Sequence, residues 1–222
     1  MRIITIPILL EGKIFHIQNY KRNYLWTEKQ WKDFVHDIDE VIDEKINGHY
    51  MGTIIMYQQP ALNRPTEKYG KRILEVVEII DGQQRLITIS LYLSIILNEL
   101  IQVDPYNFSK EPAHFLNAGN KSKLRINTKD QVFYLNLISN ESNKLQPKNS
   151  NQKRIYDAFY FLKGHLENQI NQRKVEKKEY LKDLFYAIIQ KLNFSTYLIE
   201  DNSQIQRTLD LINSRGLLMT ID

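Results

Sequence analysis

A run of polar residues between two apolar stretches is the segment of this sequence best suited to chemistry. β-Branched residues precede Asp81, and apolar residues from Leu86 onward repeat with a helical period, which predicts a strand, a tight turn at Gly82 and a helix. The first turn of a helix presents unpaired N–H groups and the positive end of the helix dipole, so it binds phosphates readily. The side chains available there are a carboxylate, two amides and a guanidinium, from Asp81, Gln83, Gln84 and Arg85.

Each of these residues has a chemical role that its type permits. Asp81 could hold Mg²⁺ or cap the helix, and Gly82 would let the backbone approach a ligand closely. Gln83 and Gln84 could orient a water or contact a base, and Arg85 could neutralise phosphate oxygens. An aspartate cap with solvated glutamine and arginine side chains would give the same sequence, because a short glycine turn is weak as a motif. Composition does not decide between the two interpretations.

A second segment, residues 20–26, alternates aromatic and basic side chains. Aromatic rings stack on bases or sugars while neighbouring cations contact phosphates, so this segment could bind a nucleotide or DNA. An edge strand or loop with solvated charged tips would have the same composition, and composition alone favours that structural interpretation. The candidate contacts in the segment are Tyr20, Lys21, Arg22, Tyr24 and Trp26.

A third polar segment, residues 213–216, places Asn213, Ser214 and Arg215 beside Gly216. An amide, a hydroxyl and a guanidinium next to a glycine could contact a phosphate. A helix C-cap would explain the glycine equally well. The segment gains importance only if the fold brings it to Asp81.

Composition excludes several classes of site. The 222 residues include no cysteine, which rules out disulfides, thiolate nucleophiles and cysteine-bound zinc and is consistent with a cytoplasmic location. The five histidines lack the spacing of a metal site, and no Walker-type phosphate loop is present. A net charge of +4 does not decide between DNA binding and ordinary solubility. Neither a signal peptide nor a membrane span is expected.

Helices and strands that alternate before about residue 102 and are mostly helical after it predict an α/β (α+β) fold. Thr27 and Gln30 form a capping box at the start of a helix that reaches Gly48. We therefore expect a lobe with a small mixed sheet at residues 1–102 and a helical lobe at 103–222. The other expected elements are strands at 13–17, 50–58, 73–80 and 194–200, helices from 83 and at 130–139, 154–172, 178–192 and 203–212, and loops at 103–127 and 141–151.

Taken in order, these segments resemble the N-terminal domain of the GmrSD family of restriction endonucleases, and the resemblance extends over nearly the whole chain. Asn19 and Lys21 differ from the proline and glutamine that are usual in the family, and residues 208–212 also depart from its pattern. The matching positions are Tyr20, Arg22, Tyr24 and Trp26; His49 to Gly52; Asp81 to Leu86 with Thr88; Leu124 to Asn127 with Asp130; and Asn213 to Gly216 with Asp222.

The resemblance implies a ParB/sulfiredoxin-like lobe that binds and hydrolyses an NTP, GTP or ATP, with Mg²⁺. It implies that Asp81 supports the metal, that Gln83 or Gln84 positions a water, and that Arg85 with Arg215 steadies the phosphates. Further nucleotide contacts would come from Gly82, Arg22, Thr88, Asn213 and Ser214, and Tyr20, Lys21, Tyr24 and Trp26 would meet DNA.

The family also implies partners and a biological role. The domain would sense modified phage DNA, and the cutting would be done by an HNH-type nuclease domain in the same chain or in a partner chain. A homo-oligomer is a further expectation. Two alternatives stay open: a nucleotide-gated DNA-binding module without turnover, and a ParB-like domain with DNase activity of its own.

Overall fold

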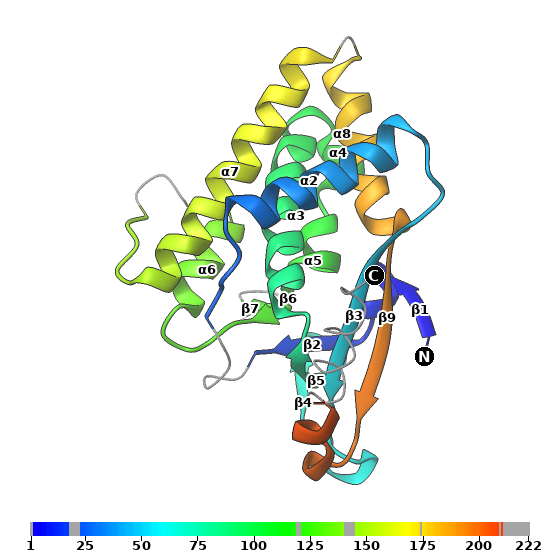
Figure 1. Ribbon diagram of the computed structural model, residues 1–222, viewed down its shortest axis with the longest axis vertical. Coiled ribbons are helices and arrows are strands. Elements are labelled where there is room, and N and C mark those ends of the chain that lie inside the picture. The colour runs from blue at the N-terminus through cyan, green and yellow to red at the C-terminus, as the bar shows by residue number, and fades with distance from the viewer. Residues whose placement is uncertain are drawn as a thin grey trace.

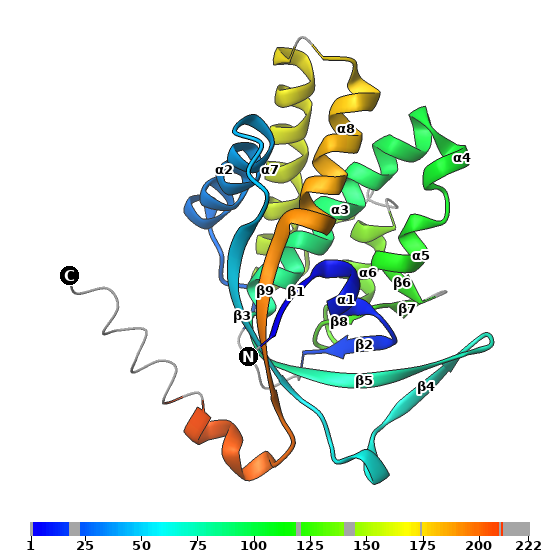
Figure 2. The same cartoon turned by 90° about the vertical axis from the view of Figure 1, so that its right-hand side faces the viewer.

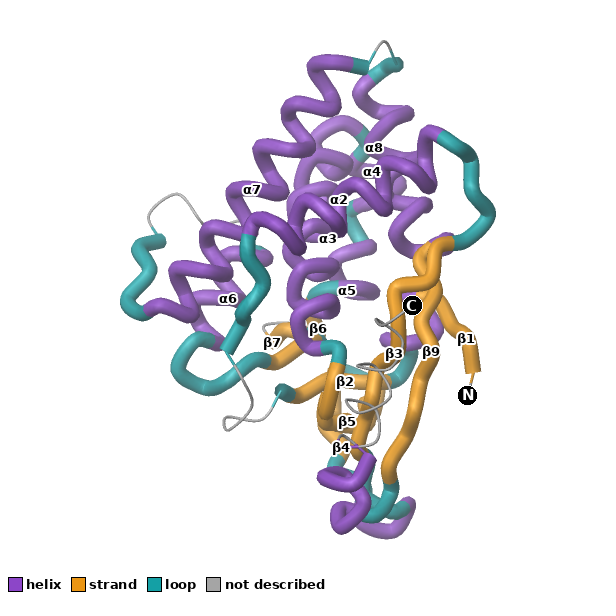
Figure 3. The backbone as a smooth tube through the Cα atoms, in the orientation of Figure 1, coloured by secondary structure: helices purple, strands orange, loops and turns teal. Residues whose placement is uncertain are grey.

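The structure is a computed structural model that describes residues 2–17, 23–118, 121–139, 145–173, 175–208 and 210. It has two layers, with a sheet at one end and a group of helices covering one side of it (Figure 1). Figure 3 separates the two layers by colour, and the long helix that begins at Gln83 runs from the end of a strand into the helical layer. The predicted mixed α+β class is confirmed.

The main sheet has seven strands in the order β1-β9-β3-β5-β2-β8, with β4 paired to the outer part of β5. Strand β9 pairs antiparallel with β1 and parallel with β3, so the sheet is mixed. Two short strands, β6 (Asn117–Ala118) and β7 (Lys121–Ser122), form a separate ribbon. The strands of the main sheet are β1 (Arg2–Thr5), β2 (Lys13–His16), β3 (His49–Tyr57), β4 (Thr66–Tyr69), β5 (Arg72–Asp81), β8 (Leu124–Arg125) and β9 (Leu192–Ile199).

The helical layer surrounds one central helix, α3 (Gln83–Val103). Helix α3 contacts α4, α5, α6, α7 and α8, and its buried residues lie on all of its faces. Its length and composition would suffice to cross a membrane, but 72% of its most apolar window is buried inside the protein, as in the core helix of a folded domain. The other helices are α1 (Ile6–Leu10), α2 (Glu28–Asp43), α4 (Pro105–Phe108), α5 (Glu111–Phe115), α6 (Gln131–Ile138), α7 (Ser150–Gln172) and α8 (Lys177–Tyr186).

Helix α2 begins where the sequence predicts. The side chains of Thr27 and Gln30 form the expected capping box, in which the Thr27 amide donates to Gln30 Oε1 at 2.9 Å. Trp31, Phe34 and Ile38 lie on its buried face. The helix ends at Asp43, five residues earlier than the predicted end near Gly48.

The predicted loop at residues 103–127 is wrong. Asp104 accepts a hydrogen bond from the Asn107 amide, and Pro105 and Pro112 occupy the first turns of α4 and α5. Proline lacks only an N–H that the first turn of a helix does not need, so these prolines start helices instead of interrupting one. Helix α7 similarly begins at Ser150, earlier than expected, because the Asn149 side chain caps it.

Both halves of the chain contribute to one sheet and one main hydrophobic core. Strands β8 and β9 come from the half after residue 102, and β9 lies between β1 and β3. The main core cluster likewise joins Phe15 and Ile54 to Leu162 and Phe194. The second half therefore completes the sheet that supports the 81–85 turn.

Candidate functional site at the turn between β5 and α3

The predicted strand-to-helix turn is confirmed. Strand β5 ends at Asp81, α3 begins at Gln83, and Gly82 between them adopts a left-handed conformation with φ 92°. A Cβ atom at Gly82 would lie 2.4 Å from Cδ1 of Ile54, so only glycine fits the turn without displacement. Gly82 is the N-cap residue and no side chain caps the helix, which excludes the capping role for Asp81.

Asp81 stands at the surface beside this uncapped helix start. Its side chain is 51% exposed, and Oδ2 lies 3.9 Å from Nη2 of Arg85. Gln83 lies half-buried in the first turn of α3. An exposed carboxylate thus lies next to an uncapped helix N-terminus. Groups of these two kinds can together hold a phosphate and a cation.

Arg85 points inward and holds a bulge in β3. Its Nη1 donates to the Met51 carbonyl at 2.6 Å and its Nη2 donates to the Thr53 carbonyl at 3.0 Å. Between these carbonyls Gly52 has φ 97°, and a Cβ atom there would lie 2.1 Å from Nη1 of Arg85. Burial lowers the pKa of Arg85, while the charge of Asp81 acts in the opposite direction. Arg85 therefore fixes the start of α3 to β3, a role that sequence reasoning did not identify.

Gln84 fixes a different neighbour, the segment before α2. Its Oε1 accepts hydrogen bonds from the amides of Leu25 at 2.8 Å and Trp26 at 3.4 Å. Its Nε2 donates to the Asn23 carbonyl at 3.0 Å. The amide side chain thus matches three main-chain groups of residues 23–26 and determines where that segment lies relative to the turn.

Tyr24 and Thr88 lie in the core and not on the surface where a ligand would meet them. Tyr24 is only 2% exposed, and its hydroxyl bonds to Thr88 Oγ1 at 2.7 Å and accepts from Trp31 Nε1 at 2.8 Å. Thr88 is fully buried and donates to the Gln84 carbonyl at 2.9 Å. The expected DNA contact by Tyr24 and nucleotide contact by Thr88 do not agree with this geometry. A tyrosine or threonine can be buried when its hydroxyl finds partners, and here Trp31, Tyr24, Thr88 and the Gln84 carbonyl form one chain of hydrogen bonds.

The main chain at Tyr24 is also held from the helical layer. The Tyr24 amide donates to Asn151 Oδ1 at 2.7 Å, and Nδ2 of Asn151 donates to the buried carboxylate of Asp130 at 2.6 Å. Burial raises the pKa of Asp130, but hydrogen bonds from surrounding amide side chains lower it more, so the net shift is downward. The segment at residues 23–26 is therefore anchored from both α3 and α7.

Trp26 is half-buried and contacts Phe34 with 6.4 Å between ring centroids. Beside it, Leu25 is 44% exposed, and its carbonyl accepts a hydrogen bond from Nη1 of Arg154 at 3.5 Å. Of the predicted DNA-contacting residues, Trp26 therefore keeps part of its surface accessible. The remaining candidates lie outside the described residues: Tyr20, Lys21, Arg22, Asn213, Ser214 and Arg215.

Tyr50 is a residue near the site that sequence reasoning did not single out. It is 54% exposed, and its hydroxyl donates to Ser195 Oγ at 3.0 Å and lies 3.2 Å from Thr53 Oγ1. Hydrogen bonding with Ser195 and Thr53 lowers the pKa of Tyr50, and the charge of Arg85 adds a smaller effect in the same direction. Its place between His49 and Gly52, which both match the family pattern, was the available signal.

The donor set suits magnesium only in the presence of phosphate. Within the described ranges, no group of three histidine, aspartate or glutamate side chains is arranged to bind a metal. Mg²⁺ is commonly held by one or two carboxylates together with substrate phosphates and water. Asp81 supplies one exposed carboxylate beside a helix start that has no side-chain cap, which fits that pattern.

The fold is a mixed α+β domain in which the strand β5 leads through Gly82 into the central helix α3, whose start has no side-chain cap. The family model of the GmrSD restriction endonuclease N-terminal domain matches residues 6–221 of the chain. The chain therefore belongs to this family. A role in a restriction system follows from that membership. Among curated proteins no match to the chain is found.

Proposed function

We propose that this chain is the nucleotide-binding sensor domain of a modification-dependent restriction system. It binds an NTP, GTP or ATP, with Mg²⁺ at the N-terminus of α3 and hydrolyses it. The observation that supports this proposal is the start of α3, where no side chain caps the helix and the exposed carboxylate of Asp81 lies alongside. Backbone amides then face the phosphates, and Gly82 keeps side-chain atoms out of the corner.

The residues of the turn divide into ligand contacts and positioning groups. Asp81 is the proposed magnesium ligand and Gln83 the residue that orients a water. Arg85 and Gln84 hold β3 and residues 23–26 in place around them. When bound, the metal would neutralise charge on the phosphates. The family resemblance adds Arg22, Asn213, Ser214 and Arg215 as further phosphate contacts.

The partners proposed for the domain follow from its family. Modified phage DNA would be the molecule sensed, and an HNH-type nuclease domain in the same or a partner chain would cut it. The ParB/sulfiredoxin-like architecture, the cytoplasmic location and a homo-oligomeric state are part of the same proposal.

Phosphate release from GTP and ATP, measured with modified DNA, unmodified DNA and no DNA, tests this function. Asp81→Asn should lower turnover roughly 100-fold, because loss of the metal contact removes a few kcal/mol of charge stabilisation. Asp157→Asn is a matched control, since Asp157 is also an exposed aspartate with a cationic partner four residues away. Equal turnover by the Asp81→Asn and Asp157→Asn variants would contradict the proposal.

One observation supports a second candidate, a nucleotide-gated module that binds without turnover. The guanidinium of Arg85 is committed to the carbonyls of Met51 and Thr53, so it is not aimed at a transferring phosphate. The same assay separates the two functions. Nucleotide binding by calorimetry without phosphate release under any of the DNA conditions would favour the second.

A further inference from the structure

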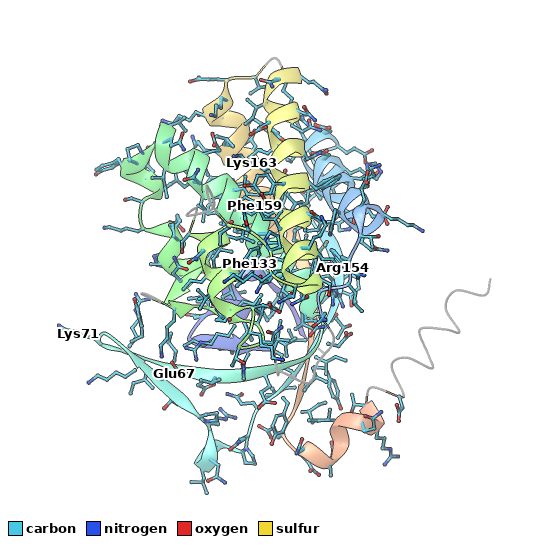
Figure 4. The ribbon with its side chains drawn as sticks, turned by 90° about the vertical axis from the view of Figure 1, so that its left-hand side faces the viewer. Glu67, Lys71, Phe133, Arg154, Phe159 and Lys163 are labelled. Atoms are coloured by element: carbon cyan, nitrogen blue, oxygen red, sulfur yellow. The ribbon has the colours of Figure 1, made fainter. Side chains whose placement is uncertain are left out.

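The hairpin of β4 and β5 extends beyond the body of the protein. In Figure 2 it projects sideways from the sheet, away from the helical layer, and in Figure 4 Lys71 marks its far end. The strands pair from Thr66↔Glu75 to Tyr69↔Arg72, and Gly70 with φ 56° provides the tight turn. The chain therefore forms a narrow two-stranded ribbon with a short, well-formed tip.

Three cations cluster at this tip. Lys68, Lys71 and Arg72 are exposed, and none of them forms an ion pair within the described part of the chain. Long basic side chains without a partner cost little when solvated, so their presence alone is ordinary. Their concentration on a projecting ribbon is what requires an explanation.

The acidic residues of the hairpin do not neutralise these cations. Glu67 binds Arg125 with both carboxylate oxygens and lies 3.1 Å from Nζ of Lys121. Glu75 accepts from Gln58 Nε2 at 2.6 Å and lies 3.4 Å from Nη1 of Arg64. Both acids are thus already paired with groups at the base of the ribbon, which leaves the tip positively charged.

A further basic residue, Lys123, lies near the hairpin but is buried. Lys123 is 9% exposed, and its Nζ lies 3.5 Å from the Leu10 carbonyl. Burial lowers the pKa of Lys123, and the charge of Arg72 lowers it further. Arg72 therefore lies close enough to Lys123 for the two positive charges to repel each other.

One exposed apolar side chain lies beside Lys68, on the face of the ribbon opposite to that of Arg72. Ile73 is 69% exposed and pairs directly with Lys68, so the two side chains project from the same face of the ribbon. An exposed isoleucine next to basic groups can bind a partner that presents apolar groups, such as methyl groups or sugars, next to phosphates. The major groove of duplex DNA presents this combination and admits a two-stranded β-ribbon.

We propose that the β4–β5 hairpin enters the major groove of duplex DNA, with Lys68, Lys71 and Arg72 on phosphates and Ile73 against the groove. This inference rests on the proposed function, because it names the surface by which the domain holds its DNA. A protruding ribbon favours a grooved partner over a flat acidic protein surface. Phosphate contacts do not depend on sequence, so the hairpin supplies affinity and register while modification is sensed elsewhere.

Fluorescence anisotropy with the whole chain tests the inference. The probe is an unmodified labelled duplex of about 30 base pairs, titrated over a series of salt concentrations. Each phosphate contact removed should lower the salt slope by about 1, so Lys68→Gln, Lys71→Gln and Arg72→Gln together should lower it by about 2 to 3. At low salt, affinity should fall about tenfold or more, while phosphate release without DNA stays at the unsubstituted level.

Two controls separate charge from folding. Lys71→Gln should weaken binding measurably, whereas Lys163→Gln should not, because Figure 4 shows Lys163 on α7, well away from the hairpin. The double variant Lys68→Arg, Lys71→Arg should bind the duplex about as tightly as the unsubstituted chain, because it keeps both positive charges and does not disturb the hairpin.

The outcomes also separate this inference from the proposed function. If the unsubstituted chain binds the duplex and the triple glutamine variant binds with the same affinity and salt slope, the hairpin inference is overturned and the proposed function stands. If the unsubstituted chain does not bind the unmodified duplex even at low salt, the hairpin inference is overturned, and the sensing of modified DNA is tested separately by phosphate release with modified DNA. Phosphate release tests the nucleotide part in either case.

Discussion

At the scale of single residues, Arg85 connects the candidate site to the sheet. It lies 34 positions from Met51 in the sequence, and its two hydrogen bonds span the bulge at Gly52. The sequence predicts that Arg85 binds phosphates of a ligand, whereas in the structure its guanidinium binds main-chain carbonyls of β3. A substitution at this position would therefore affect folding before it affects chemistry.

Arg85→Ala should lower the free energy of unfolding by about 2 to 4 kcal/mol, because two carbonyls lose their charged donor. Arg85→Lys should lie between the alanine variant and the unsubstituted protein, since an ammonium keeps the charge but cannot span both carbonyls. Urea denaturation without nucleotide measures both. The exposed Arg72→Ala serves as the control and should change stability by less than about 0.5 kcal/mol. An Arg85→Ala variant as stable as this control would contradict the positioning role.

Local contacts could be predicted from the sequence, and distant ones could not. The capping box of Thr27 and Gln30 was predicted because its partners lie three residues apart. The hydroxyl pair of Tyr24 and Thr88 spans 64 positions, so no pattern along the chain indicates it. Alternating aromatic and basic residues gave Tyr24 a surface role, but burial depends on neighbours that only the fold supplies.

At the scale of elements, one carboxylate joins the β4–β5 hairpin to the short strand β8. Glu67 lies in β4 and binds Arg125 in β8. Hydrogen bonds from Arg125 are the main cause that lowers the pKa of Glu67 to about 2. The base of the hairpin is thus fixed to the sheet edge while its tip projects.

A group whose pKa is lower in the folded state stabilises that state above its unfolded pKa and loses this effect as the pH falls. Glu67→Gln should therefore destabilise the protein by about 1 kcal/mol near neutral pH, a modest value because the pair is partly exposed. The difference should shrink as the pH falls from about 4.5 toward 2. Chemical denaturation of both proteins between about pH 7 and pH 3 measures it. A difference that stays constant over this range would contradict the assignment.

The prediction of helices and strands is correct where apolar residues recur with a regular period. It is wrong where prolines start helices, because proline is also common in turns. The long apolar repeat from residue 83 gave α3, and the alternating runs gave β3 and β5. The segment at 103–127 was predicted as a loop because its prolines and asparagine suggest turns. In the structure the prolines begin two short helices, and Asp104 caps the first of them. Both helices contact α3.

At the scale of the whole molecule, the sheet order could not be predicted. Strand β9 pairs with β1 and β3, which precede it by more than a hundred residues. Pairing over such distances leaves no periodic signal, so the sequence predicts a strand at 194–200 but not its place between β1 and β3. The proposed lobes at 1–102 and 103–222 therefore meet within one sheet.

A fragment of residues 1–102 should not fold alone. It would lack β9, and it would expose the faces of α3 that α7 and α8 cover, including Leu91 and Ile96, which are fully buried in the whole chain. Urea unfolding followed by circular dichroism, with the whole chain as control, should show no cooperative transition for the fragment. A sharp transition and well-dispersed amide resonances would instead show an independent lobe.

The late position of β9 in the chain also affects synthesis of the protein. Strand β1 pairs with the main sheet only through β9, and one edge of β3 is unpaired until β9 has been made. A ribosome that has made the first 190 residues therefore carries an incomplete sheet with an open edge, which is the kind of surface that molecular chaperones cover. Completion of the strand at Ile199 closes that edge, so the sheet stays incomplete until β9 has been synthesised.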